Sequence, residues 1–183
     1  SSNPPDTVEL KSGLVCVGSV NDTSFTFAIS EDITKAVINE GDTTTPNYVA
    51  NFDNLPIKQG TFITKQFTFD NSLDQKFILD NPSIDTSTLH VYVKRDEGTS
   101  GLGIEYFVAD GLNDIDSTSR VFFLQEVKDE KYEIKFGDGL IGRKLGSDGI
   151  SDGVIITANY IVTDGQNGNG ASTFSFAGNL TNT

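Results

Sequence analysis

The stretch YEIKFGDGLIGRKLG, Tyr132 to Gly146, has residue types that could bind phosphate, because four glycines and a basic pair interrupt a strand-like run. A nucleotide-binding P-loop has two glycines with four residues between them, then Lys, then Ser or Thr. The lysine reaches the terminal phosphates and the hydroxyl holds magnesium. Gly137 and Gly142 have this separation, but Arg143 stands at the lysine position and Lys144 at the hydroxyl position. The next residues form another glycine-rich turn and not the helix that would face a phosphate. The stretch is therefore predicted to be a turn between two strands.

The turn itself has a specific predicted geometry. Gly137 and Gly139 are expected to allow positive φ on either side of Asp138, whose side chain can bond its own turn backbone. Arg143 and Lys144 are interpreted as solvated or interface charges and not as ligands.

Calcium binding is the better chemical alternative, because calcium prefers oxygen ligands and several acids and amides lie in glycine-rich loops. These residues are Asp148, Asp152, Asp164, Asn167 and Asn169. An EF-hand loop needs Gly at its sixth position, whereas DGQNGN, starting at Asp164, has Asn there. The simpler interpretation is that Asp, Asn and Gly adopt the backbone angles of tight turns. A structural calcium ion stays an open alternative, and no cofactor or metal is predicted.

Catalysis is not predicted. The chain has a single histidine, His90, and a single cysteine, Cys16, in unrelated segments, so no nucleophile and base pair up. Paired carboxylates of the glycosidase type stay open because acids are numerous, but nothing singles out a pair. Cys16 lies in an apolar run and is interpreted as a small buried residue.

The charge balance limits the expected partners. The 183 residues include 26 acids and 13 basic residues, a formal charge of -13, which repels phosphate on average. The closest basic pairs, Lys94–Arg95 and Arg143–Lys144, each lie near acids, so no basic patch is predicted and nucleic acid is not an expected partner. No run approaches the roughly 20 apolar residues that cross a bilayer, so no membrane partner is predicted. The absence of Met indicates a piece of a longer protein.

Short strand-like runs recur between clusters of Gly, Asp, Asn and Ser, a pattern typical of antiparallel β domains. The sequence predicts a mainly β fold of antiparallel sheets or a sandwich, with long loops and at most one or two short helices. The predicted strands are 14–17, 24–29, 36–39, 61–69, 76–79, 89–93, 104–108, 121–124, 132–136, 154–162 and 173–176.

Three segments carry more detailed expectations. Asn21–Asp22 is predicted to close a hairpin between the first two strands. Ser30 could cap a helix, but the β-branched residues that follow favour a strand over Ala36–Asn39. In the run Leu89 to Val93, His90 and Tyr92 lie opposite the aliphatic residues and are predicted to be surface or interface side chains.

An ordered set of residues in the second half of the chain resembles the signature of baseplate J-like proteins, the wedge proteins of contractile phage tails and related injection machines. The set is Phe136, Gly137, Asp138, Gly139, Gly142, Tyr160, Gly168 and Asn169. The likeness extends over residues 35–180 and is most similar to the large baseplate wedge subunit of T-even-type tails. One departure is the segment 145–153, which is longer than usual and lacks a proline.

The resemblance implies a structural role without catalysis. Such subunits bind copies of themselves and other wedge proteins in a ring around the tail hub. The implied location is the virion tail baseplate, after assembly in the host bacterial cytoplasm, with no small-molecule substrate. Residues 1–34 are predicted to form an arm and a hairpin, and residues 35–183 a β-rich wedge domain. Two alternatives stay open: an acidic β-sandwich that binds carbohydrate or acts as an adhesin, with or without calcium, and a hydrolase with paired carboxylates.

Overall fold

The computed structural model describes residues 4–71, 74–95, 100–112, 114–147 and 152–182. Strands make up 54% of the chain and helix 4%, which confirms the prediction of a mainly β fold. Over these described ranges, the helical residues form two short 3-10 helices, η1 (Lys128–Glu130) and η2 (Gly165–Gly168). In the described part of the chain, no helix has the length and apolar character needed to cross a membrane.

The chain folds into two compact units. The first consists of residues 1–62 together with 163–183, and the second is Ile63–Val162. The sequence placed a division after residue 34, whereas these units divide after Phe62 and again after Val162. The chain therefore leaves the first unit, builds the second, and returns to complete the first.

The first unit is built around a hairpin. β2 (Gly13–Val20) pairs antiparallel with β3 (Thr23–Ile29), and Asn21 and Asp22 between them have φ of 47° and 64°. Positive φ at both central residues is the geometry of a type I′ turn, which matches the twist of paired strands. The predicted hairpin is therefore confirmed.

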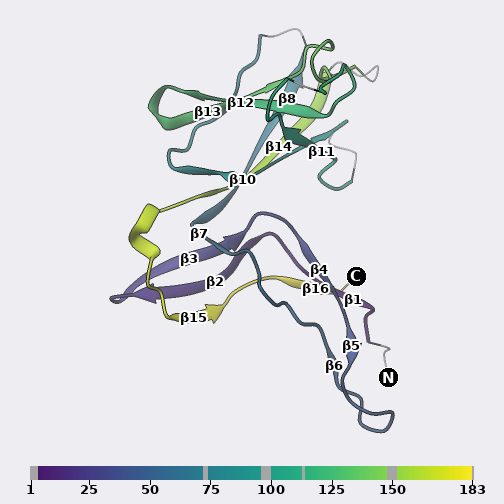
Figure 1. Ribbon diagram of the computed structural model, residues 1–183, viewed down its shortest axis with the longest axis vertical. Helices are drawn as coiled ribbons and strands as arrows, with labels where there is room; N and C mark the ends of the chain where they lie inside the picture. Colours follow the sequence, from purple (N-terminus) through teal and green to yellow (C-terminus); the bar gives the residue numbers. More distant parts are fainter. Residues whose placement is uncertain (1–3, 72–73, 96–99, 113, 148–151, 183) are drawn as a thin grey trace. The chain divides into compact units, whose positions relative to one another are not determined.

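Short strands extend this unit into three sheets, ordered β15-β2-β3-β7, β16-β1-β4 and β5-β6 (Figure 1). The further strands are β1 (Thr7–Leu10), β4 (Ile33–Ala36), β5 (Ile38–Asn39), β6 (Tyr48–Val49), β7 (Lys58–Gln59), β15 (Thr173–Phe176) and β16 (Leu180–Asn182). β4 and β5 confirm the prediction that the chain forms a strand and not a helix after Ser30. A small core of Leu10, Val15 and Ile29 packs with Phe52 and Leu55. Cys16 is buried, as predicted.

The second unit is a seven-stranded sheet in the order β8-β14-β10-β11-β12-β13-β9 (Figure 1). The strands are β8 (Thr61–Asp70), β9 (Phe77–Leu79), β10 (Ile84–Lys94), β11 (Ile104–Val108), β12 (Val121–Val127), β13 (Lys131–Phe136) and β14 (Asp152–Val162). The pairing of β11 with β12 is parallel, with Phe107 opposite Val121, which departs from the predicted antiparallel arrangement.

The edge strands of this sheet approach each other. The ring of Phe77 on β9 lies 5.5 Å from the ring of Phe67 on β8, in an edge-to-face arrangement. The side chain of Gln75 donates to the carbonyl of Thr68 at 3.0 Å and accepts from the backbone N–H of Asp70 at 2.7 Å. The sheet thus curves into a near-barrel, which covers edges that would otherwise be exposed.

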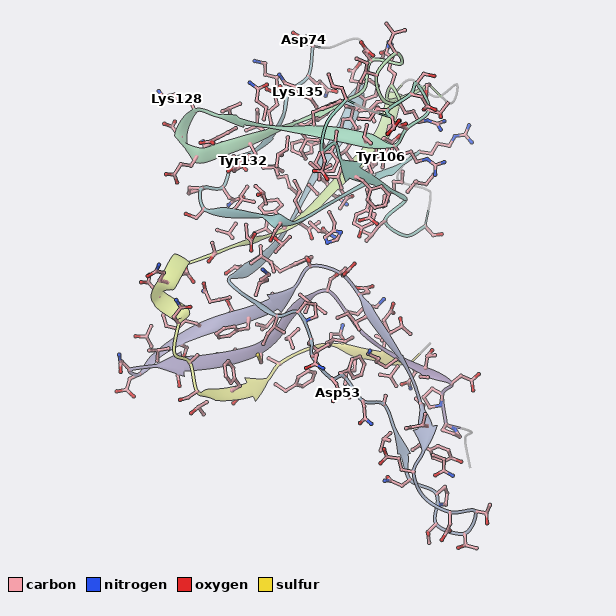
Figure 2. The ribbon with its side chains drawn as sticks, in the orientation of Figure 1. Asp53, Asp74, Tyr106, Lys128, Tyr132 and Lys135 are labelled. Carbon is pink, nitrogen blue, oxygen red and sulfur yellow. The ribbon has the colours of Figure 1, made fainter. Side chains whose placement is uncertain are left out.

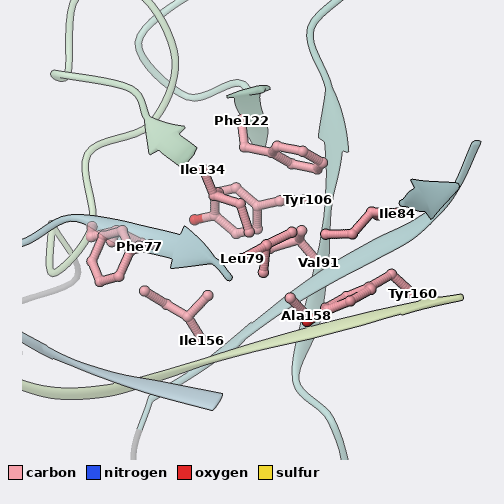
Figure 3. Packing of buried hydrophobic residues seen from close by; sticks show 11 residues of the cluster. Phe77, Leu79, Ile84, Val91, Tyr106, Phe122, Ile134, Ile156, Ala158 and Tyr160 are labelled. Atoms are coloured by element: carbon pink, nitrogen blue, oxygen red, sulfur yellow. The ribbon is translucent and has the colours of Figure 1, made fainter. Parts of the chain in front are cut away.

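β14 runs through the core and is buried from Val154 to Ile161. Ile156, Ala158 and Tyr160 belong to the main apolar cluster (Figure 3). Between them, Thr157 and Asn159 point to the other face and bond to polar side chains of β8, so both faces of the strand are satisfied.

Candidate functional site

The GDG loop, residues 136–144, follows β13 and folds back on itself. Gly137 forms a parallel bridge with Lys144, and the N–H of Gly139 donates to the carbonyl of Gly142 at 3.1 Å. Oδ1 of Asp138 accepts the N–H groups of Leu140 at 2.8 Å and Ile141 at 2.9 Å. These bonds lower the pKa of the Asp138 carboxyl, because they stabilise its charged form. The predicted turn role of Asp138 is confirmed.

The loop glycines have two different functions. Gly139 has φ of 91°, as predicted, and Gly142 has φ of 77°. The prediction of positive φ is wrong for Gly137, which is absent from the positive-φ glycines of the described chain. A Cβ on Gly137 would instead lie 2.6 Å from Cα of Gly142. Gly137 is therefore required by close backbone approach and not by handedness.

A second loop, residues 116–120, holds the GDG loop in place. The N–H of Gly142 donates to the carbonyl of Asp116 at 3.0 Å, and that of Arg143 donates to Ser119 at 2.8 Å. Oδ1 of Asp116 accepts the N–H of Thr118 at 2.8 Å, and hydrogen bonds of this kind lower the pKa of the Asp116 carboxyl. Two loops with internally bonded aspartates thus fix each other.

Beside these loops lies a hollow of about 170 Å³, named here the basic pocket. Its charged lining residues are Lys94, Arg95, Arg120, Arg143 and Lys144. Val93, Ile104, Tyr106, Leu145 and Val154 form most of the remaining wall, with Tyr106 on β11 (Figure 2). The sequence analysis predicted no basic patch, whereas the fold brings two distant basic pairs and Arg120 to one pocket.

Three acidic side chains of the neighbouring strand and loops, Glu105, Asp116 and Asp138, form hydrogen bonds outside the pocket. Asp116 and Asp138 bond to their own turns, and Glu105, on the opposite face of β11 from Tyr106, has its Oε1 2.8 Å from Nδ1 of His90. Of the described residues, none places a carboxylate within ion-pair distance of Arg95, Arg120 or Lys144. Among the described residues, three of the five cations thus have no carboxylate at ion-pair distance.

The pKa of the Tyr106 hydroxyl reflects two of the charges that line the pocket. Its side chain is buried, and burial raises the pKa of its hydroxyl, while the positive charges of Arg143 and Arg120 oppose that rise. Both guanidinium groups therefore act on the same point of the pocket wall.

The structure does not bring all predicted motif residues together. Tyr160 lies in the core of the second unit, where its hydroxyl donates to Asn81 at 2.6 Å. Gly168 and Asn169 belong to the first unit, and Gly168 packs on the side chain of Gln59. Only the residues from Phe136 to Lys144 form one local structure.

The two other predicted interface residues lie on the face of β10 away from the core. The rings of His90 and Tyr92 are stacked with centroids 6.4 Å apart, and each side chain is half-buried. Neither lines the basic pocket.

A set of exposed apolar side chains on β11 and in the GDG loop, named here the apolar rim, was missed by the sequence analysis. It consists of Ile104, Phe107, Val108, Leu140 and Ile141. Leu140 is 80% exposed and Phe107 61%. Two consecutive aliphatic residues inside a glycine turn were the available signal, because such turns ordinarily carry polar side chains.

The calcium alternative gains no support. Asp148 lies outside the described residues, and the side chain of Asp164 accepts from Gln59 at 2.8 Å. Within the described ranges, no three His, Cys, Asp or Glu side chains are grouped so that they could hold a metal ion.

Comparison with the models of known protein families gives no match, and comparison with curated proteins gives none either. The resemblance to baseplate J-like proteins therefore stays a prediction.

Proposed function

We propose that this chain is a structural module of a contractile phage tail baseplate, of the baseplate J-like wedge type, which binds neighbouring subunits. The observation that supports this proposal is the apolar rim. Exposed apolar side chains that gather in one region are typical of surfaces that other proteins cover, whereas single ones are ordinary.

The rim is suited to binding because its backbone is already ordered. The N–H groups of Leu140 and Ile141 are bonded to Asp138, and the N–H of Phe107 donates to Arg120 at 3.0 Å. A partner therefore pays little to order these segments. Fully burying one such side chain contributes roughly 1.5 to 3 kcal/mol, so a few of them can hold a subunit contact.

The test compares two double variants. L140S/I141S removes apolar area from the rim, while the control I38S/I57S removes apolar area from exposed residues of the first unit. Sedimentation velocity measures self-association of the chain and its binding to other wedge proteins. Incorporation into tails is measured in host cells that express the variant and are infected by a phage that lacks its own copy of the subunit.

The rim variant is expected to lose association and incorporation, and the control variant to retain both. A chain that stays monomeric, binds no wedge protein and fails to enter tails would overturn the proposed function. Equal behaviour of the two variants would remove the rim as its basis.

A further inference from the structure

The basic pocket concentrates positive charge in a strongly negative chain. It holds five of the 13 basic residues, which leaves 13 − 5 = 8 for the rest of the chain, against 26 acids. A local field of this kind attracts anions to one point of a surface that otherwise repels them.

The cations come from three segments whose backbones are fixed together. Lys94 ends β10, which pairs with β11, and the carbonyl of Arg120 accepts the N–H of Phe107 on β11 at 3.0 Å. The N–H of Arg143 donates to Ser119 at 2.8 Å. The positions from which these side chains extend are thus set before any ligand binds, which lowers the cost of binding.

The five cations of the pocket carry like charges, which repel each other. Arg95, Arg120 and Lys144 have no ion-pair partner among the residues described, and Arg120 and Arg143 both act on Tyr106. An anion with more than one negative charge would relieve this repulsion. Guanidinium groups suit that task because their planar donors match two oxygens of a phosphate or a carboxylate.

We propose that the basic pocket binds a small multivalent oxyanion, a phosphate ester or a polycarboxylate. The arginines and lysines hold its oxygens, and the apolar wall of Val93, Leu145 and Val154 contacts its organic part. The volume of about 170 Å³ is several times the roughly 30 Å³ that one water occupies in the liquid. A long polyanion such as nucleic acid would extend onto the acidic remainder of the chain, which repels it. The pocket shares Ile104 with the apolar rim, but the two tests change different residues, so either proposal can fail alone.

The test uses inorganic phosphate, pyrophosphate and citrate as probes of the full chain. Isothermal titration calorimetry measures affinity, and backbone amide shifts locate the site in ¹H–¹⁵N NMR spectra. The pocket variant R120Q/K144Q is compared with K76Q/K128Q, which removes the same charge from exposed lysines of the same unit outside the pocket. The spectra also verify that each variant is folded.

Pyrophosphate is expected to bind more tightly than phosphate and to shift the amides of residues 120 and 143–145. The pocket variant is expected to bind about tenfold more weakly, since two exposed ion pairs together contribute on the order of 1.4 kcal/mol. The control should match the unsubstituted chain. Binding of citrate as well would assign the site to oxyanions in general, and binding of pyrophosphate without citrate would narrow the class to phosphates. No binding at millimolar concentrations, or equal weakening in both variants, would overturn the proposal.

Discussion

Replacing Gly137 with Ala should destabilise the second unit far more than the addition of a single methyl group suggests. The added Cβ would lie 2.6 Å from Cα of Gly142, and nearer still to the carbonyl group of that residue. Real Cβ atoms essentially never approach closer than 3.0 Å, so the backbone must separate. No flexible side chain is available to yield.

The size of the effect follows from what that separation breaks. The carbonyl of Gly142 accepts from Gly139 at 3.1 Å, and its N–H donates to Asp116 at 3.0 Å. Each bond contributes about 1 kcal/mol, and overpacking alone costs roughly 1 to 3 kcal/mol. We expect the free energy of unfolding of G137A to fall by about 3 kcal/mol.

Two other glycine variants provide matched controls. Gly139 and Gly101 both have positive φ, and a Cβ on either would meet nothing closer than 3.6 Å. Each alanine should therefore cost only the left-handed strain of about 1 kcal/mol. The expected order of destabilisation is G137A first, then G139A and G101A together.

Urea unfolding followed by tyrosine fluorescence measures these differences. Four of the five tyrosines, Tyr92, Tyr106, Tyr132 and Tyr160, lie in the second unit, so the signal reports mainly that unit. If G137A unfolds at the same urea concentration as G139A, or at a higher one, the steric explanation of Gly137 is incorrect.

Two further predictions concern acid and the core. The N–H groups of Ile141 and Leu140 lower the pKa of the Asp138 carboxyl from 3.8 in the folded protein. The charged carboxylate therefore stabilises the fold above pH 3.8, and this stabilisation is lost as the pH falls through the folded-state pKa. The NMR chemical shifts of these two amides should therefore change as the pH is lowered. The variant D138N, which keeps an oxygen acceptor, should abolish this titration. An unchanged titration in D138N would assign the titration to another group. Y160F should lower the free energy of unfolding by about 1 kcal/mol, because it removes the hydroxyl that donates a 2.6 Å hydrogen bond to Asn81. Urea unfolding measures this change, and an unchanged free energy of unfolding would mean that the hydrogen bond makes no net contribution to stability.

Most of the fold could be predicted from the sequence, because strand patterns and turns are local. Thr61–Phe69 alternates and forms β8, with Phe67 and Phe69 packed on the core. The short strands β1 and β16 were missed, because four and three residues are too few to show a period. The parallel pairing of β11 with β12 was also missed, since alternation along a strand does not encode the direction of its neighbour.

The candidate site was only partly predictable. The bonds of Asp138 to its own turn follow from neighbouring residues, so the sequence predicted them. The requirement for Gly at position 137 depends on how closely residue 142 returns, which no local rule gives.

The sequence by itself determined the β class, the hairpin at Asn21–Asp22 and the chemistry of the aspartate turn. Each depends on residues a few positions apart, whose geometry is set by backbone sterics and short hydrogen bonds. The tertiary structure alone decided that Lys94, Arg120 and Arg143 share one pocket. Their proximity results from strand order and loop docking, and a linear charge pattern carries no information about either.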